Sequence, residues 1–206
     1  KRLDGRATDE IRDIWCETGI APRAHGSGIF TRGETQTFVT VALGTEVDAQ
    51  RLELPYGRFE RTFMLTYNFA PFCTGEARPL RGPKRREIGH GALAERSIAP
   101  VIPSLEDFPY AVRVTSEIME SNGSTSMAAI CSGTLALLDA GVPLKRPVAG
   151  ISIGLCTRSN DAGDIEAYKL LADIIGWEDA FCDMDCKIAG TDTGITGFQL
   201  DLKLKG

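Results

Sequence analysis

Three aspartates and a lysine lie within one short stretch of the chain, residues 179–187. If the part from Asp183 onward is extended, side chains alternate between two faces, so Asp183, Asp185 and Lys187 share one face. Like charges on one face of a strand repel each other. A cation among the carboxylates relieves this repulsion, and oxygen ligands alone favour Mg²⁺ or Mn²⁺. The alternative is an exposed strand end on which Lys187 balances the acids.

A second group of polar side chains precedes an apolar stretch. Residues 121–126 contain a glycine and three consecutive hydroxyls, at Ser124, Thr125 and Ser126, and the apolar residues 127–140 predict a helix. Free N–H groups and the dipole at a helix start favour an anion. One hydroxyl is enough to cap a helix, so the segment is either a well-capped helix start or an anion site.

Basic residues gather in residues 84–90, at the start of a second predicted helix that spans residues 87–99. Arg85 and Arg86 offer planar forks that suit phosphate oxygens. Arginines at a helix start oppose the helix dipole, which favours an external anion as their partner. The alternatives are a solvated charge run and, for His90, a capping or packing role.

The composition is that of an ordinary globular protein: the 206 residues are 43% apolar and 25% charged, which fits one large domain or two small ones. Two histidines and the lack of a C-x-x-C pair argue against zinc, and the six cysteines are typical of a reducing compartment. Without a long apolar run or a signal peptide, we expect no membrane partner and a cytoplasmic location. The net charge of −5 argues against general nucleic-acid binding but leaves a local basic patch open.

Helical and extended patterns alternate along the chain, so we expect an α+β fold. Strands are predicted at residues 11–17, 25–30, 36–44, 61–69, 111–118, 147–156 and 195–204. We also expect an irregular loop over residues 70–86, a polar turn over 158–164, and a short strand or helical turn over 168–177. Loops as long as the first of these often carry function.

Six segments resemble the second RNase PH-type domain of polynucleotide phosphorylase. They are residues 25–36 (HGSGIFTRGETQ), 63–69 (FMLTYNF), 85–94 (RREIGHGALA), 116–124 (SEIMESNGS), 138–143 (LDAGVP) and 182–190 (CDMDCKIAG). The likeness runs nearly end to end, and several long motifs in one order make it specific. It implies an α+β RNase PH-type fold, the ribosomal protein domain 2-like βαβ arrangement with mixed sheets packed against helices.

The resemblance also implies that residues 1–206 are a single catalytic domain of a longer chain, because the family's first RNase PH-type domain, helical segment, and KH and OB-type modules are not in this sequence. Position by position, it implies roles for the polar residues above. They are phosphate binding for Ser124, Thr125 and Ser126, catalysis for Arg85, Arg86, Asp185 and Lys187, RNA binding for His90 with both arginines, and metal binding for Asp179 and Asp185.

Three positions depart from the family pattern. Thr125 keeps the hydroxyl of the usual serine, whereas Cys182 and Cys186 stand where glycine and phenylalanine are common. The two cysteines leave every proposed ligand in place.

The activity that the resemblance implies is phosphorolysis of RNA from its 3′ end, which releases nucleoside diphosphates and is reversible as a polymerase. Mg²⁺ or Mn²⁺ is the implied cofactor and orthophosphate the co-substrate. The implied partners are the RNA 3′ end and a homotrimeric ring that includes a first RNase PH-type domain. Residues that place and neutralise charge, without a nucleophile–base pair, suit such a reaction. Two alternatives stay open: an RNase PH-like enzyme that trims tRNA 3′ ends, and a catalytically silent ring subunit that only binds RNA.

Overall fold

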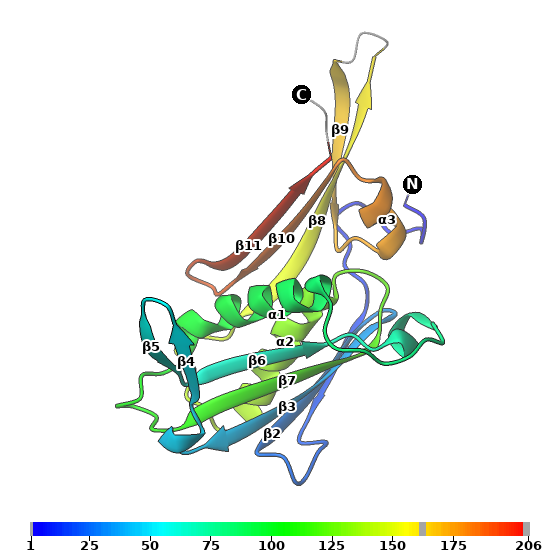
Figure 1. The fold of residues 1–206 in the computed structure, drawn as a ribbon. Helices are drawn as coiled ribbons and strands as arrows, with labels where there is room; N and C mark the ends of the chain where they lie inside the picture. The colour runs from blue at the N-terminus through cyan, green and yellow to red at the C-terminus, as the bar shows by residue number, and fades with distance from the viewer. Residues whose placement is uncertain (1, 161–163, 204–206) are drawn as a thin grey trace.

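Two twisted sheets enclose a pair of helices in the computed structural model, which describes residues 2–160 and 164–203 (Figure 1). Helices α1 (Arg85–Ile98) and α2 (Thr125–Asp139) form the middle layer. Because α2 has a sheet on either side, it is apolar around most of its circumference, as a fully enclosed helix must be. Among the described residues, no helix has the length and apolar content that a membrane crossing needs.

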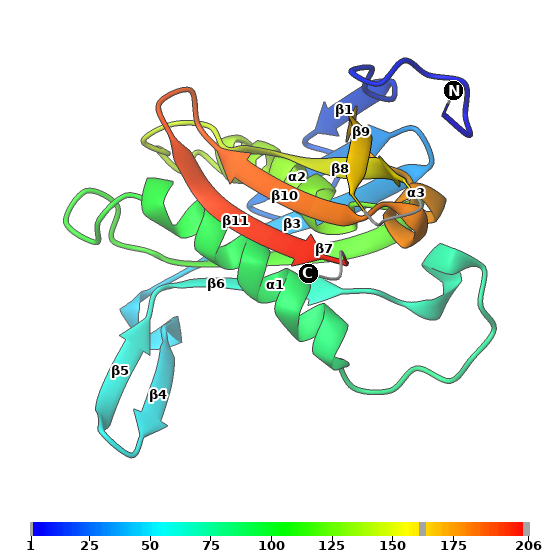
Figure 2. The same ribbon diagram turned by 90° about the horizontal axis from the view of Figure 1, so that it is seen from above.

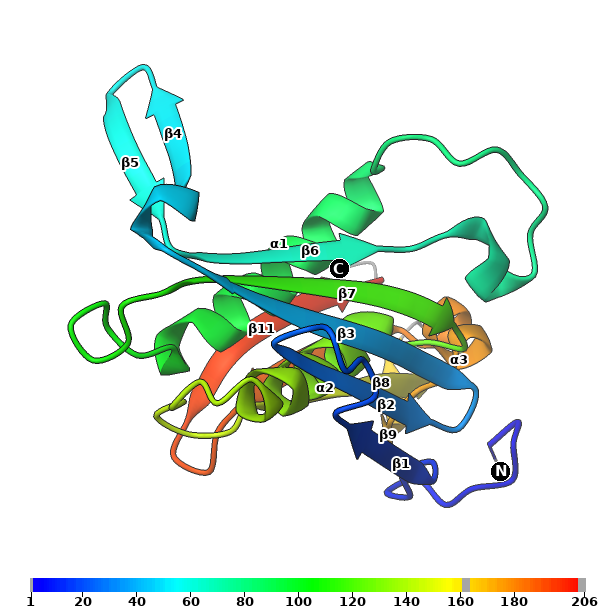
Figure 3. The same cartoon turned by 90° about the horizontal axis from the view of Figure 1, so that it is seen from below.

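The first sheet has five strands in the order β1-β2-β3-β7-β6 (Figure 3). They are β1 (Ile14–Thr18), β2 (Gly26–Arg32), β3 (Thr35–Gly44), β6 (Phe63–Asn68) and β7 (Ala111–Glu120). Only β6 and β7 are parallel, because α1 lies between them in the chain and supplies the crossover that parallel neighbours require. Alternate residues of these strands, such as Val39, Val41 and Val114, are buried against the helices.

The second sheet has four antiparallel strands in the order β11-β10-β8-β9. They are β8 (Ala149–Ser159), β9 (Ile165–Ala172), β10 (Met184–Gly190) and β11 (Ile195–Leu202). The short helix α3 (Gly176–Phe181) joins β9 to β10 at one end of this sheet (Figure 2).

Glycines let α2 approach both sheets closely. A Cβ atom on Gly26 of β2 would lie 2.4 Å from the Ala136 carbonyl oxygen, and one on Gly150 of β8 would lie 2.8 Å from the Met127 sulfur. A larger residue at Gly26 would force α2 away from β2, and one at Gly150 would displace the Met127 side chain. The start of α2 is therefore held directly against β8.

Each strand predicted from sequence is present, with ends shifted by a few residues. The segment predicted as a short strand or helical turn over residues 168–177 forms the end of β9 and the beginning of α3. Strand β8 extends into the turn predicted at residues 158–164, of which 161–163 lie outside the described residues, as does residue 204 of the last predicted strand.

Two features differ from the sequence prediction. A hairpin of β4 (Gln50–Leu54) and β5 (Gly57–Arg61) projects from one end of the molecule, where no strand was predicted (Figures 2 and 3). Its residues are mostly exposed, so they lack the apolar alternation that marks a half-buried strand. The loop predicted for residues 70–86 contains a 3₁₀ turn (Pro71–Thr74) and ends early, because α1 begins at Arg85.

The early start of α1 has a local cause. The Glu87 carboxylate accepts a hydrogen bond of 2.8 Å from the Lys84 backbone N–H and so closes the first turn two residues before the predicted start. Arg85 and Arg86 therefore belong to the helix rather than to a loop. Neighbouring helical residues point about 100° apart, so the two guanidinium groups diverge.

Candidate active site

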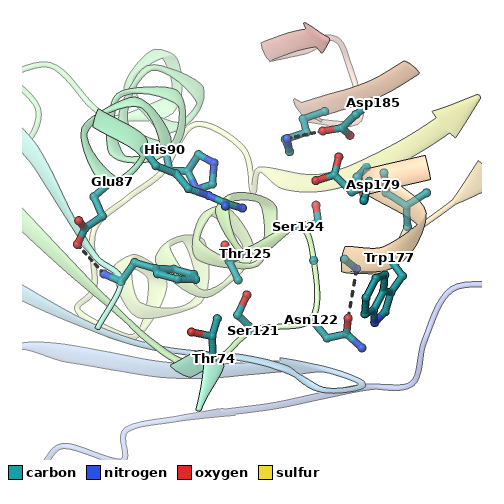
Figure 4. A pocket seen from close by; sticks show the side chains of 18 of the residues that line it. Thr74, Glu87, His90, Ser121, Asn122, Ser124, Thr125, Trp177, Asp179 and Asp185 are labelled. Atoms are coloured by element: carbon teal, nitrogen blue, oxygen red, sulfur yellow. Dashed lines mark hydrogen bonds and ion pairs between the residues drawn. The ribbon is translucent and has the colours of Figure 1, made fainter. Parts of the chain in front are cut away.

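A cavity of about 590 Å³ opens where the starts of α1 and α2 meet α3 and the second sheet (Figure 4). Most of the residues singled out from the sequence line it, although they come from four elements, α1, α2 with its N-cap residue, α3 and β10. They are Arg86, His90, Ser124, Thr125, Asp179, Asp185 and Lys187. Arg85 and Ser126 are not among the lining residues.

Residues 121–126, which we call the hydroxyl segment, lead into α2 in an unusual backbone conformation. Ser124 precedes the first helical residue with φ at 54°, a left-handed region that residues other than glycine rarely adopt. Its buried Oγ atom has no hydrogen-bond partner among the described residues, and neither does the Oγ of Ser126. Strain together with an unpaired polar atom is typical of a site that a ligand completes.

Thr125 belongs to a short chain of hydrogen bonds that the sequence analysis missed. Its hydroxyl lies 2.7 Å from the hydroxyl of Tyr67 on β6, which in turn lies 3.4 Å from Nδ1 of His90. Burial raises the pKa of Tyr67, so its hydroxyl keeps its proton. Residue 67 lies in one of the motifs quoted above, but only the structure shows that its hydroxyl contacts Thr125, which lines the cavity.

His90 is neutral at pH 7. Burial is the main cause that lowers its pKa to about 4, and the positive charges of Arg86 and Lys187 lower it further. Its ring packs edge-on against Tyr67, with 5.4 Å between the ring centroids. The imidazole therefore enters the cavity wall as an uncharged hydrogen-bonding group.

Of the two adjacent arginines, Arg86 faces the cavity. Its guanidinium carbon lies 5.8 Å from the centre of the Phe69 ring, a cation–π contact that orients the side chain. Arg85, one position earlier on the same turn, points elsewhere and is exposed.

Asp185 and Lys187 lie on one face of β10, as the alternation of an extended chain predicts. The Lys187 ammonium is 2.6 Å from Oδ2 of Asp185, whereas the buried Oδ1 has no partner in the part of the chain described. Burial raises the pKa of Asp185, the charge of Asp179 raises it further, and Lys187 opposes both. Asp179 reaches the same space from α3 (Figure 4).

Asp183 differs from the expectation that it would share the face of Asp185 and Lys187. It lies just before β10, and its carboxylate accepts hydrogen bonds of 2.6 and 2.8 Å from the backbone N–H and hydroxyl of Thr157 on β8. Asp183 is not a lining residue of the cavity. Its hydrogen bonds connect the beginning of β10 to β8.

The two carboxylates fit a divalent ion that also binds water and substrate. No group of three or more histidine, cysteine, aspartate or glutamate side chains suited to a metal occurs among residues 2–160 and 164–203. Mg²⁺ commonly takes one or two carboxylates and completes its shell with water and phosphate oxygens. The unpaired Oδ1 of Asp185, beside Asp179, is a suitable oxygen ligand for such an ion.

A buried ionic cluster positions the walls of the cavity. Asp173, which is fully buried between β9 and α3, forms ion pairs with Arg6 at 3.1 Å, Arg12 at 2.8 Å and Arg32 at 2.7 Å. We call these four residues the Asp173 cluster. Next to it, Arg2 pairs with Glu178 of α3 at 2.7 Å, so the first residues of the chain hold this helix in place.

The Asp173 cluster also forms hydrogen bonds with the hydroxyl segment. Arg12 donates a hydrogen bond of 2.8 Å to the carbonyl of Asn122, and Arg32 donates one of 3.1 Å to the carbonyl of Ser124. The Asp173 cluster therefore fixes the hydroxyl segment, and the neighbouring Arg2–Glu178 pair holds the helix that carries Asp179.

Direct packing joins the same two segments. The Asn122 side-chain oxygen accepts a hydrogen bond of 3.2 Å from the Gly176 N–H at the start of α3 (Figure 4). A Cβ on Gly123, whose φ is +89°, would lie 2.8 Å from both the Gly176 nitrogen and the Ile174 oxygen. Only glycine satisfies both the backbone angle and this close approach.

Comparisons with known proteins show the family to which this chain belongs. A family model described as the 3′ exoribonuclease family, domain 1, matches residues 10–143. The chain belongs to the 3′ exoribonuclease family. The RNase PH-type α+β fold expected from the sequence is thereby confirmed.

Relatives of this 3′ exoribonuclease-family chain are similar to it over its whole length. The polyribonucleotide nucleotidyltransferase of Christiangramia forsetii is 57% identical over 205 residues, and that of Desulfotalea psychrophila is 58% identical over 205 residues. Both matches cover 100% of this chain, but only 26% and 29% of the respective relatives. They confirm the resemblance to polynucleotide phosphorylase.

A solved structure shares the fold. The crystal structure of rice (Oryza sativa) Rrp46 matches with a TM-score of 0.76 and 18% sequence identity, over 99% of this chain and 87% of that chain. The match of the family model ends at residue 143, before the second sheet, so Asp179, Asp185 and Lys187 lie outside it. The similarity to the nucleotidyltransferases does extend over these residues.

Proposed function

We propose that this chain is the catalytic RNase PH-type domain of a polyribonucleotide nucleotidyltransferase, a phosphate-dependent 3′-to-5′ exoribonuclease that also runs in reverse as a polymerase. The observation that carries the proposal is the single cavity in which an anion-binding helix start and Arg86 face the carboxylates of Asp179 and Asp185. The full-length similarity to nucleotidyltransferases supports the same activity.

In this proposal, orthophosphate binds at the start of α2. The Ser124 hydroxyl is unpaired there, and the backbone N–H groups of Thr125 and Ser126 have no carbonyl within the helix to which they can donate. Arg86 supplies charge from the opposite wall. Tyr67 orients the Thr125 hydroxyl through the 2.7 Å contact.

The RNA 3′ end binds beside the phosphate. His90, which is neutral, offers a hydrogen bond to a ribose or phosphate oxygen, and Arg85, exposed on the first turn of α1, contacts the backbone further out. Contacts to sugar and phosphate carry no sequence information, so weak base preference is expected.

Asp179 and Asp185 would hold Mg²⁺ or Mn²⁺, which supplies positive charge for the scissile phosphate and the departing 3′ oxygen. Lys187 holds Asp185 in position through their 2.6 Å contact. In the reaction, an orthophosphate oxygen bonds to the last phosphorus while the bond from that phosphorus to the preceding 3′ oxygen breaks. That oxygen takes up a proton, a nucleoside diphosphate leaves, and the RNA is one nucleotide shorter.

The proposal includes partners beyond this chain. Because the chain spans 26% and 29% of two nucleotidyltransferases, we infer that residues 1–206 are one domain of a longer chain with a first RNase PH-type domain. A homotrimeric ring and a cytoplasmic location belong to the same proposal. Light scattering of the full-length protein tests the trimer.

The decisive experiment supplies the full-length protein with poly(A), orthophosphate and Mg²⁺ and measures ADP. We expect phosphate-dependent ADP release, and Asp185→Asn should abolish it while leaving the melting temperature within a few degrees. The matched control is Asp201→Asn, because Asp201 is exposed and lies directly opposite Asp185 on β11. Full ADP release by Asp185→Asn would refute the proposed site.

Other products would support the alternatives. AMP formed without phosphate would indicate a hydrolase. Preference for tRNA precursors over poly(A) in direct competition would indicate an RNase PH-like trimming enzyme. RNA binding without any ADP would indicate a silent ring subunit.

A further inference from the structure

Ser152 lies on β8, and the sequence analysis gave it no role. It stands directly opposite Lys187 of β10 in the strand register, and it lines the same cavity. Gly150 and Gly154, two positions to either side, share its face of the sheet. Because Gly150 packs against Met127, this face lies over the first turn of α2.

The Ser152 side chain is fully buried, yet its hydroxyl oxygen has no hydrogen-bond partner in the described part of the chain. Two other lining atoms share this condition, Oγ of Ser124 and Oδ1 of Asp185. A buried polar atom without a partner costs free energy, so such atoms are rare and call for an explanation. Oδ1 of Asp185 is the atom described above as a suitable ligand for a divalent ion. The two hydroxyls are donors, and together they point to a ligand that accepts hydrogen bonds.

The surroundings of Ser152 define the chemistry of that ligand. Its neighbour across the strands is Lys187, whose side chain ends in an ammonium group, and the face that carries both residues meets the positive end of the α2 dipole. A hydroxyl donor beside an ammonium and free helix N–H groups suits an oxyanion.

We propose that Ser152 is a phosphate-binding residue, whose hydroxyl donates a hydrogen bond to an oxygen of orthophosphate. The proposal rests on the proposed function, because it adds a donor from the second sheet to the phosphate site at the start of α2. The ion is then held from two layers of the fold, by Ser124 from the helix side and by Ser152 from the sheet side.

The chain offers a matched control. Ser116 on β7 is also fully buried, and its hydroxyl is likewise without a partner among the described residues, but it does not line the cavity. Substituting it removes the same kind of atom from the same kind of surroundings. Any effect common to Ser116→Ala and Ser152→Ala is therefore structural.

The test measures steady-state phosphorolysis of poly(A) and direct binding of orthophosphate by calorimetry, in the full-length protein with Mg²⁺. Loss of a hydrogen bond to a charged group commonly weakens binding about tenfold or more. We expect Ser152→Ala to raise the KM and Kd for phosphate about tenfold, with kcat and the KM for RNA within twofold. Ser116→Ala should leave all four values unchanged.

Ser152→Cys keeps the side-chain volume but is a poor donor. It should weaken phosphate binding as the alanine variant does, and it replaces that variant if Ser152→Ala does not fold. Unchanged phosphate affinity in both Ser152 variants would overturn the proposal, as would an effect on the KM for RNA alone. If the unmodified protein neither binds phosphate nor forms ADP, the proposed function itself fails.

Discussion

Single side chains in the cavity show where sequence patterns suffice and where they do not. The hydroxyls at 124–126 and the acids at 179 and 185 stand out by residue type alone. Four of these five positions line one cavity, all but Ser126, and they do so only because distant elements meet. The choice of Arg86 over Arg85 depends on which residue begins α1, and that depends on the Glu87 carboxylate. The role of Tyr67 follows from the contact of its hydroxyl with Thr125, and that of Ser152 from its strand register with Lys187, neither of which a sequence pattern shows.

The charge state of His90 provides a prediction at this scale. Burial, followed by the charges of Arg86 and Lys187, lowers its pKa to about 4. Protonation therefore favours the unfolded chain, whose histidine has a pKa of about 6.5, so this group weakens stability as pH falls from about 6.5 to 4. NMR titration of the imidazole should show a midpoint near 4.

In a protein limited to residues 1–206, which contain two histidines, the substitution His25→Gln leaves a single imidazole signal to follow. In the Arg86→Ala variant the midpoint for His90 should move upward, because one positive neighbour is removed. A midpoint near 6.5 in the unsubstituted protein would contradict the buried environment described for this ring.

Among the elements, burial explains several of the successful predictions, although strand β1 was predicted and all of its residues are exposed. The alternation of β3 and β7 and the apolar run of α2 reflect burial against the middle layer. The β4–β5 hairpin buries little, so its pattern carries no such signal. The position of α3 depends on contacts with residues far away in sequence, which a local pattern does not encode.

A pair of thiols connects α3 to the second sheet. The Sγ atoms of Cys156 on β8 and Cys182, the residue after α3, are 3.1 Å apart. Both are free thiols, and burial is the main cause that raises the pKa of Cys182 to about 12. The contact is close enough for oxidation to join them with little movement of the backbone.

We expect diamide, an azo oxidant, to join Cys156 and Cys182. The two thiols lose two protons and two electrons, which reduce the azo bond to a hydrazine. The disulfide would close a loop over a sequence separation of 26 and raise stability by about 3 kcal/mol, chiefly by restricting the unfolded chain.

Peptide mass spectrometry and thermal melting check this result. Cys156→Ser should prevent both the crosslink and the rise in melting temperature. Since few Cys182 thiols ionise at neutral pH, the reaction should be slow and should accelerate at higher pH. No crosslink after prolonged treatment at pH 9 would contradict the geometry.

For the molecule as a whole, the Asp173 cluster is the main link between its first residues and its second sheet. Arg6, Arg12 and Arg32 neutralise one buried carboxylate. No local sequence pattern predicts this cluster, because Arg6 and Asp173 are 167 positions apart. Removing the carboxylate leaves arginines without their partner, and a broken buried ion pair commonly costs about 3–5 kcal/mol.

Asp173→Asn should therefore lower the free energy of unfolding by about 3–5 kcal/mol at pH 7, measured by urea denaturation. Asp192→Asn is the control, because its pair with Arg146 is exposed and should contribute about 1 kcal/mol at most. Equal effects of the two substitutions would refute the importance of the cluster.

The pH dependence of the same carboxylate has a definite sign. Burial alone would raise the pKa of Asp173, but the hydrogen bond from Arg12 and the charge of Arg32 outweigh it, so the pKa lies below the ordinary 3.8. Its contribution to stability is complete above about pH 4 and is lost as the pH falls through the folded-state pKa. The difference between Asp173→Asn and the unsubstituted protein should therefore shrink in acid.

The contacts of Arg2, Arg6 and Arg12 with residues 173 and 178 also bear on how the chain folds while it is being made. During synthesis, these three arginines stay without their carboxylate partners until α3 has left the ribosome, more than 160 residues later. The first sheet and its helices are complete well before then. Within residues 2–203, residues 2–12 are thus made first but dock among the last, and the cavity takes its final shape only at that moment.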